Sequence, residues 1–440
     1  MDLYLIIVII MLALAVSGLV VGVANDAVNF LNSALGSKAA PRYVIMTVAS
    51  VGIIVGAITS NGMMEVARSG VFHPEMFTFA EVMLLFLAVM FTNVILLDIF
   101  NTLGMPTSTT VSLVFGLLGA AVGISIFKIA NDALVTLPDG SLATMADMIN
   151  TGNAMAIIGG ILISVVIAFV CGTVVMYITR LIFSFRYQSK LKSYGAVWCG
   201  IALTAISYFA VFKGLKGTQV IPADWMSWME GHIPMMLGGL LVGWSLIMSI
   251  LSMLKVNILR ITVLAGTFSL ALAFAGNDLV NFIGVFVAGV DAYDIVRTTG
   301  DTNMLMGGLN DPVVANLLIL FLSGAVMVVT LWFSKKAQSV SDTEINLARQ
   351  DVGVERFGST SASRAIVRAT INCNKNYEKY TPERIQRFIA SRFVPVANRW
   401  LRRCNCRFRL LTWPLWWRWV VRFPTGPGGG RVPCTGLPGC

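Results

Sequence analysis

Charged residues are scarce in this chain of 440 residues. Asp, Glu, Lys and Arg together make up 12% of the sequence, which is about half the share of an average soluble domain. Hydrophobic residues reach 56%, and the mean hydropathy is +0.78. This composition excludes an ordinary soluble domain and predicts an all-α polytopic membrane protein.

Histidine is almost absent, and cysteine forms no recognisable framework. His73 and His232 are the two histidines, and the sequence offers no Ser-His-Asp grouping, so we do not expect an enzyme or a catalytic residue. Cys404 and Cys406 lack the two-residue spacer of common zinc sites. The sequence therefore predicts no resident cofactor.

Long apolar segments take the place of the missing charge. Each is long enough to cross a hydrocarbon core of roughly 30 Å. The sequence predicts nine crossings, near residues 3–23, 42–60, 79–98, 107–129, 153–179, 195–212, 234–254, 259–290 and 312–333. Three pairs of glycines within them predict close helix packing, namely Gly52 with Gly56, Gly119 with Gly123 and Gly239 with Gly243.

Basic loop residues set the expected orientation. Counting the crossings places four basic clusters on one side, which we take as cytoplasmic. These clusters are Lys38 and Arg42; Arg180, Arg186, Lys190 and Lys192; Lys255 and Arg260; and Lys335 and Lys336. We therefore expect a cell inner membrane protein with its N-terminus outside and its C-terminal tail in the cytoplasm.

One polar hexapeptide occurs twice inside apolar segments. Residues 25–30 read Asn-Asp-Ala-Val-Asn-Phe, and residues 277–282 read Asn-Asp-Leu-Val-Asn-Phe. Ionisable groups at membrane depth are costly and are functional candidates by default. The expected topology makes the two copies antiparallel, which predicts inverted repeats with interrupted helices around a midplane site. An accidental recurrence of a short polar string is the alternative.

A second polar element, residues 104–110, precedes the fourth apolar segment. It reads Gly-Met-Pro-Thr-Ser-Thr-Thr, and Pro106 suits the first turn of a helix. The hydroxyls that follow Pro106 would lie beside the free amides of a helix N-terminus, where anions bind. A simple N-cap with surface hydroxyls is the alternative.

The C-terminal quarter has a different composition. Residues 334–440 carry 19 Lys and Arg against 6 Asp and Glu. Basic segments next to a membrane commonly face anionic lipid, so we favour that interpretation over nucleic-acid binding. After Glu383 no acidic residue occurs, and residues 392–440 are rich in Arg, Trp, Pro, Gly and Cys. We interpret this tail as non-native sequence, with a membrane-surface segment as the alternative.

These motifs together resemble the inorganic phosphate transporter (PiT) family. Its hallmark is a Gly-Ala-Asn-Asp-x-x-Asn motif and a Pro-x-Ser-Thr-Thr element in each inverted half. The second half here has no Pro-x-Ser-Thr-Thr element after residue 333, so we expect an incomplete second repeat. The resulting segments are 1–130 for the first repeat, 131–255 for connecting helices, 256–333 for the start of the second repeat, 334–391 for a polar cytoplasmic segment and 392–440 for the tail.

The resemblance also implies which residues form the site. Phosphate would be bound by carboxylate, amide and hydroxyl groups, namely Asp26, Asn29, Ser108, Thr109, Thr110, Asp278 and Asn281. A coupling cation would be bound by Asn25, Asp26, Asn29, Asn277, Asp278 and Asn281, with sodium held at Asn25, Asp26, Asn277 and Asp278.

The family's activity supplies the expected function. It is import of inorganic phosphate by alternating access, coupled to sodium or to protons, and the sequence does not choose between these ions. Two alternatives stay open, a nonfunctional truncated product and a transporter or channel for another small anion. The expected partners are phosphate, sodium or a proton, and the lipid bilayer, without nucleic acid; a homodimer is compatible with the sequence.

Overall fold

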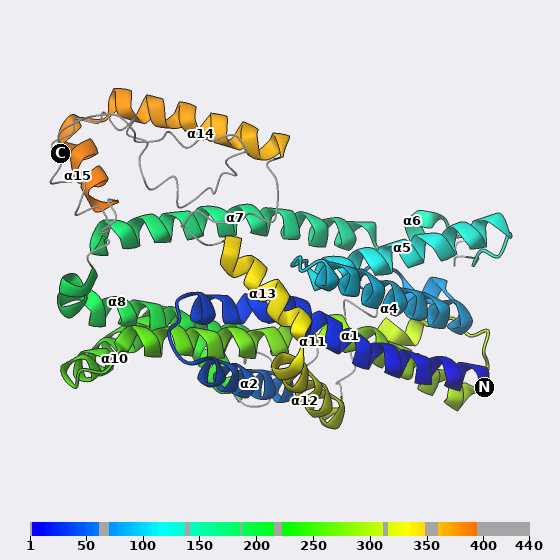
Figure 1. Cartoon of the computed structure of the whole chain (residues 1–440). Coiled ribbons are helices and arrows are strands. Elements are labelled where there is room, and N and C mark those ends of the chain that lie inside the picture. Colours follow the sequence, from blue (N-terminus) through cyan, green and yellow to red (C-terminus); the bar gives the residue numbers. More distant parts are fainter. Residues whose placement is uncertain are drawn as a thin grey trace. The chain divides into compact units, whose positions relative to one another are not determined.

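A computed structural model describes residues 2–60, 70–136, 141–184, 187–214, 222–310, 316–347 and 360–393. Within these ranges the regular structure is helical, apart from three isolated β-bridges between connecting segments. This confirms the predicted all-α fold (Figure 1).

The helices are long where the sequence is apolar and short in the connections. Their bounds are α1 Asp2–Gly36, α2 Arg42–Thr59, η1 Pro74–Met76, α4 Phe79–Thr102, α5 Thr109–Ala130, α6 Met145–Met148, α7 Thr151–Phe183, α8 Tyr187–Phe209, η2 Ala210–Gly214, α9 Ala223–Gly231, α10 Ile233–Met253, α11 Ile258–Thr299, η3 Gly307–Asn310, α12 Leu317–Phe333, α13 Lys335–Leu347, α14 Ser361–Tyr380 and α15 Glu383–Arg392.

Eight helices in the described part of the chain are long and apolar enough to cross a membrane. A ninth span is obtained if α12 and α13, which meet at a bend of 67°, count together. The prediction of about nine crossings is therefore confirmed, and the chain is an integral membrane protein.

Capping groups written in the sequence determine where several helices begin. Thr78 and Glu81 form a reciprocal capping box at the start of α4. The Ser108 hydroxyl accepts a hydrogen bond from the Val111 amide and caps α5, and Asn257 caps α11 in the same way. Pro106 consequently lies in the connection before the cap, and the expectation that it occupies the first turn of a helix is wrong.

The chain divides into two compact units. One comprises residues 1–165 and 194–345, and the other comprises residues 166–193 and 346–440. In the first unit α11 is central, because α1, α2, α4, α5 and α12 all contact it. Most of the side chains of α11 between Ala271 and Gly289 are buried in the main hydrophobic core.

The two helices that carry the hexapeptides run antiparallel. As residue numbers increase along α1, the numbers of the residues that it contacts on α11 decrease. The pairs are Met11 with Gly289, Gly22 with Phe282, and Phe30 with Phe274. In the chain α2 follows α1, and α12 follows α11. The structure packs α11 on α2 and α1 on α12, so each motif helix contacts the helix that comes after the other motif helix. Inverted repeats predict this reciprocal packing, although the repeat symmetry itself stays a prediction.

Neither motif interrupts its helix. Asn25–Phe30 lies within the continuous α1, and Asn277–Phe282 lies within the continuous 42-residue α11. The expected breaks are therefore absent from these two described helices. The polar side chains find partners on neighbouring elements, as shown below, so the helical backbone keeps its own hydrogen bonds.

Close helix packing occurs at one of the three glycine pairs. A side chain at Gly52 or Gly56 would collide with the backbone of α11, at Phe268 and Leu272 respectively. No atom lies within 4 Å of the corresponding positions at Gly119, Gly123, Gly239 and Gly243, so within the described structure these two pairs do not use the close approach that their spacing permits.

We expect Gly56→Ala to destabilise the chain by about 1–3 kcal/mol, because its Cβ would overlap the Leu272 carbonyl and separate α2 from α11. Gly119→Ala is the matched control, since the added methyl group meets open space. Unfolding of both variants in detergent, followed by circular dichroism, checks the difference. Equal stabilities would show that α2 and α11 do not depend on this close approach.

The connections at one end of the first unit bind one another through backbone hydrogen bonds. The Phe79 amide donates to Met304 O at 3.1 Å, and the Met306 amide donates to Phe77 O at 3.0 Å. Beside them the His73 amide donates to Met148 O at 2.9 Å. These bonds join segments 70–79, 141–150 and 301–310 into a cap over the start of α4 and the end of α11.

Candidate functional site

The site begins at the tight turn between α4 and α5. Gly104 has a positive φ of 62°, and its amide donates to Asn101 O at 3.0 Å. The next amide, of Met105, reaches back to Phe100 O at 2.9 Å. These two bonds form a Schellman motif, which ends α4 and requires a residue that tolerates the left-handed conformation. The chain then turns back so that the Thr107 amide faces α1.

Asn25 of the first motif holds this turn in place. Its side chain is completely buried, and Asn25 Oδ1 accepts a hydrogen bond from the Thr107 amide at 2.8 Å. Asn25 Nδ2 donates to Asn101 Oδ1 at 2.7 Å and to Met105 O at 3.3 Å. Asn101 Nδ2 in turn donates to Val21 O at 2.7 Å. Asn25 thus links α1 to the turn.

Two consecutive threonines at the start of α5 each contact a different motif. Thr109 donates its hydroxyl proton to Asp26 Oδ2 at 2.9 Å, from the first motif. Thr110 Oγ1 accepts a hydrogen bond from Asn281 Nδ2 at 2.9 Å, and Asn281 Nδ2 also donates to Asp278 Oδ1 at 3.0 Å. The first turn of α5 therefore joins both copies of the hexapeptide.

The site contains two carboxyl groups. Asp26 is 4% exposed and Asp278 is half-buried, and hydrogen bonds link both to the first turn of α5, directly for Asp26 and through Asn281 for Asp278. Among the described residues neither carboxylate belongs to a salt bridge. Opposite them the Thr109 and Thr110 amides lie in the first turn of α5, where no preceding carbonyl is available to them. The site thus combines carboxylates for a cation with free amides for an anion.

The structure brings together seven of the residues predicted from the sequence. Asn25, Asp26, Asp278, Asn281, Thr109 and Thr110 form the network, and Ser108 is its exposed N-cap neighbour. Asn29 and Asn277 are exposed and lie outside this network. In the first motif, therefore, the first asparagine (Asn25) belongs to the network and the second (Asn29) does not. In the second motif the second asparagine (Asn281) belongs to it and the first (Asn277) does not.

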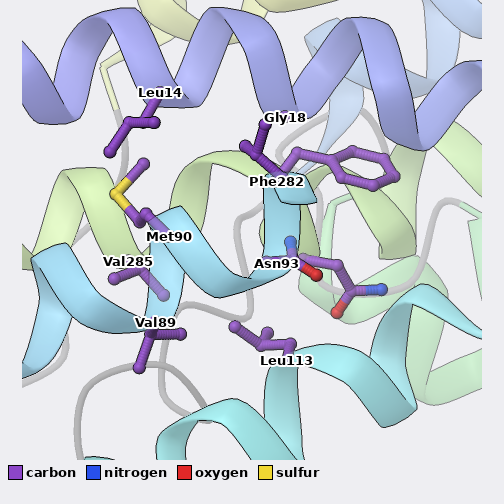
Figure 2. Close-up of a pocket in the computed structure, with 10 residues that line it drawn as sticks. Leu14, Gly18, Val89, Met90, Asn93, Leu113, Phe282 and Val285 are labelled. Atoms are coloured by element: carbon purple, nitrogen blue, oxygen red, sulfur yellow. The ribbon is translucent and has the colours of Figure 1, made fainter. Parts of the chain in front are cut away.

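Two asparagines on α4 were missed by the sequence analysis. Asn101 supports Asn25, and Asn93 Oδ1 accepts a hydrogen bond from the Ser112 hydroxyl at 2.6 Å. Asn93 and Asn281 line a narrow cavity among α1, α4, α5 and α11, which has room for about one water molecule. Figure 2 shows Asn93 near Leu113, Phe282 and Met90 of its wall. Amides in an apolar segment are themselves a signal, which could have identified both residues.

A cation could be held only by oxygen ligands here. The described residues contain no group of three His, Cys, Asp or Glu side chains that could bind a metal ion. The carboxylates of Asp26 and Asp278, with the Asn281 amide oxygen, are suitable ligands for a hard cation such as sodium. Asn25 Oδ1 already accepts the Thr107 amide, so its first role is to hold the turn.

The resemblance to phosphate transporters implies that Asn101→Ala raises the half-saturation concentration of phosphate uptake, because Asn25 would lose its 2.7 Å partner and the turn would lose its fixed position. An increase of about 5-fold to 10-fold corresponds to the roughly 1–1.5 kcal/mol of one hydrogen bond. Uptake rates over a range of phosphate concentrations measure it. Asn131→Ala is the control, because Asn131 Nδ2 donates to Phe127 O at 2.8 Å at the other end of α5, outside the site; equal half-saturation constants in Asn101→Ala and the parent would contradict this role.

The fold and the site define a polytopic membrane protein with a buried polar site made from two antiparallel copies of one motif. The sequence profile described as the phosphate transporter family matches residues 22–337, which is more than two thirds of the chain. The chain belongs to this family.

Two similar proteins agree with this membership. A predicted phosphate permease of Thermococcus kodakarensis is 25% identical over 200 residues, which are 45% of this chain and 45% of the relative. The match thus spans less than half the length of that relative. A solved structure described as "The sodium-dependent phosphate transporter" is similar with a TM-score of 0.53 and 20% identity, over 77% of this chain and 78% of that one. This likeness supports the fold.

Proposed function

We propose that the chain is a secondary transporter that moves inorganic phosphate across the membrane together with a cation. The observation that carries the proposal is the first turn of α5, where Thr109 and Thr110 bind one motif each. A phosphate bound at this turn would lie next to both copies of the hexapeptide.

Phosphate must lose water to enter a buried site. The free amides at the start of α5 and the hydroxyls of Ser108, Thr109 and Thr110 supply donors in place of that water. Thr110 Oγ1 accepts from Asn281, so its own hydroxyl hydrogen is left to donate. Thr109 donates to Asp26, and we propose that this proton turns to phosphate once a cation occupies the carboxylate.

The carboxylates explain why a cation is needed. Phosphate next to Asp26 and Asp278 would be repelled by like charge unless a cation or a proton compensates it. One sodium ion at each carboxylate would neutralise both and remove the repulsion that phosphate would otherwise meet. Protonation of the carboxylates would remove the same repulsion for proton coupling. Both uses give obligatory coupling, because phosphate binds well only when the carboxylate charge is compensated.

The antiparallel motif helices support alternating access. α1 and α11 cross at the site, and each packs on the helix that follows the other. We propose that this pseudo-symmetric pair rocks about the site between an outward-open and an inward-open state. The basic clusters of the connecting loops favour an inner membrane location with the N-terminus outside.

Reconstituted vesicles test the proposal. The purified chain should take up radiolabelled phosphate with saturation, and accumulation above the outside concentration should stop when both the sodium gradient and the proton gradient are removed. Imposing one gradient at a time identifies the coupling ion. Competition by sulfate tests the alternative that another small anion is the substrate.

Two outcomes would contradict the proposal. Uptake that rises linearly with phosphate and needs no gradient would indicate a channel. Absence of phosphate uptake under every gradient, by a chain that is folded in the vesicles, would show that this polypeptide is not a transporter by itself.

A further inference from the structure

The segment after the last span contains two amphipathic helices. In α14 the residues at successive helical spacings share one apolar and exposed face, namely Ile366, Ala369, Cys373 and Tyr380. Arg364 and Arg368 lie on the opposite face, one turn apart. Ile366 is 57% exposed and gives this face its largest aliphatic side chain.

The next helix, α15, repeats the pattern on a smaller scale. Ile385 and Phe388 lie on one face and are 48% and 52% exposed. Arg387 lies on the opposite side, whereas Arg384 and Arg392 lie one turn before and one turn after Phe388 and flank it. The Arg392 guanidinium is 4.8 Å from the centre of the Phe388 ring, so a basic group lies directly beside the apolar side chains.

The end of α15 is attached to a membrane-spanning helix. Phe393, which follows α15 and is buried, stacks on Tyr177 with 5.7 Å between the ring centres. Tyr177 lies six residues before the end of α7, whose 33 residues exceed the ~20 that a bilayer core requires. If the apolar residues 153–179 of α7 cross the bilayer, Tyr177 would lie near the headgroups, where aromatic residues are enriched. This contact lies within one compact unit.

The charge of the segment selects the kind of surface. Residues 360–393 contain seven Lys and Arg and two Glu. A helix with an apolar face and a basic face is suited to lie in a membrane interface, where anionic lipid attracts the basic residues.

We propose that α14 and α15 lie on the membrane that holds the chain, with their apolar faces in the acyl boundary and their basic faces on anionic phospholipid headgroups. The partner is a lipid surface of negative charge, and the Tyr177–Phe393 contact holds the second helix at its depth. This assignment does not depend on phosphate transport.

Cys373 provides a native probe on the apolar face, because it is a free and exposed cysteine. In the full chain the other six cysteines are replaced by serine, and Cys373 is labelled with an environment-sensitive fluorophore. The matched control is Asn372→Cys with Cys373→Ser, which moves the label by one residue to the polar side and changes no charge. Both are reconstituted in vesicles of neutral phosphatidylcholine, and in vesicles that also contain phosphatidylglycerol.

In anionic vesicles the label at position 373 should be quenched by lipids with a nitroxide on the acyl chain roughly threefold or more strongly than the label at position 372. The difference should shrink in neutral vesicles and at about 1 M salt, where the Debye length falls to about 3 Å. Arg364→Gln with Arg368→Gln should reduce it in anionic vesicles as well.

Three results would overturn the proposal. Equal quenching at both positions would show that α14 does not present this face to lipid. A shielded label at position 373 without quenching by lipid would show that a protein, such as a second copy of the chain, covers the face. Quenching that is the same in neutral and anionic vesicles would show that the helices do not recognise the negative charge of the headgroups.

Discussion

Asp26→Asn is expected to reduce coupled phosphate uptake about 100-fold or more, which corresponds to about 2.7 kcal/mol. The amide oxygen can still accept the Thr109 hydroxyl, so the contact to α5 survives while the negative charge is lost. In the proposed mechanism the loss of this charge weakens cation binding, so phosphate is left without a compensating positive charge. Asp278→Asn should have a similar effect, because its amide oxygen can still accept from Asn281.

Uptake by vesicles that contain equal amounts of folded protein measures this effect. Asp98→Asn is the control, since Asp98 is a half-exposed carboxylate on α4 that pairs with Lys336 outside the site. It should change uptake less than about twofold, as expected for a surface ion pair. Parent-like uptake by both site variants would remove Asp26 and Asp278 from the site.

Lys128→Met is expected to lower the free energy of unfolding by about 3 kcal/mol, near the lower end of the range for breaking a buried ion pair. Lys128 is 2% exposed, its Nζ is 2.8 Å from Glu81 Oε2, and it also donates to Met76 O at 3.1 Å. Its loss would leave the Glu81 carboxylate without a countercharge beside the cap of connecting segments.

Unfolding by SDS titration checks this prediction. Lys128→Met with Glu81→Gln should recover most of the loss, because the pair is then neutral on both sides and the amide oxygen introduced at position 81 can still accept from the Thr78 amide. Lys336→Met should cost below about 1 kcal/mol, since its partner pair is exposed. If Lys128→Met and Lys336→Met lower the free energy of unfolding equally, burial does not make the Lys128–Glu81 pair more important for stability than the exposed Lys336–Asp98 pair.

The sequence by itself determined the membrane class, the number of crossings and the position of the two motifs. These properties depend on local composition, since a span needs only enough consecutive apolar residues and an intramembrane Asp is conspicuous against them. The hydroxyls after Pro106 were also placed correctly at a helix N-terminus, because Ser108 is a strong cap wherever the chain places it.

Only the tertiary structure decided what the motif residues contact. A sequence gives Asn25 and Asn29 the same chemistry, yet Asn25 is buried against Asn101 and Thr107, while Asn29 is exposed. The continuity of α1 and α11 also depended on neighbours, because lateral partners satisfied the polar side chains and left the helical backbone intact. The meeting of Thr109 with Asp26 and of Thr110 with Asn281 joins residues 83 and 171 positions apart, and such contacts arise only when helices pack.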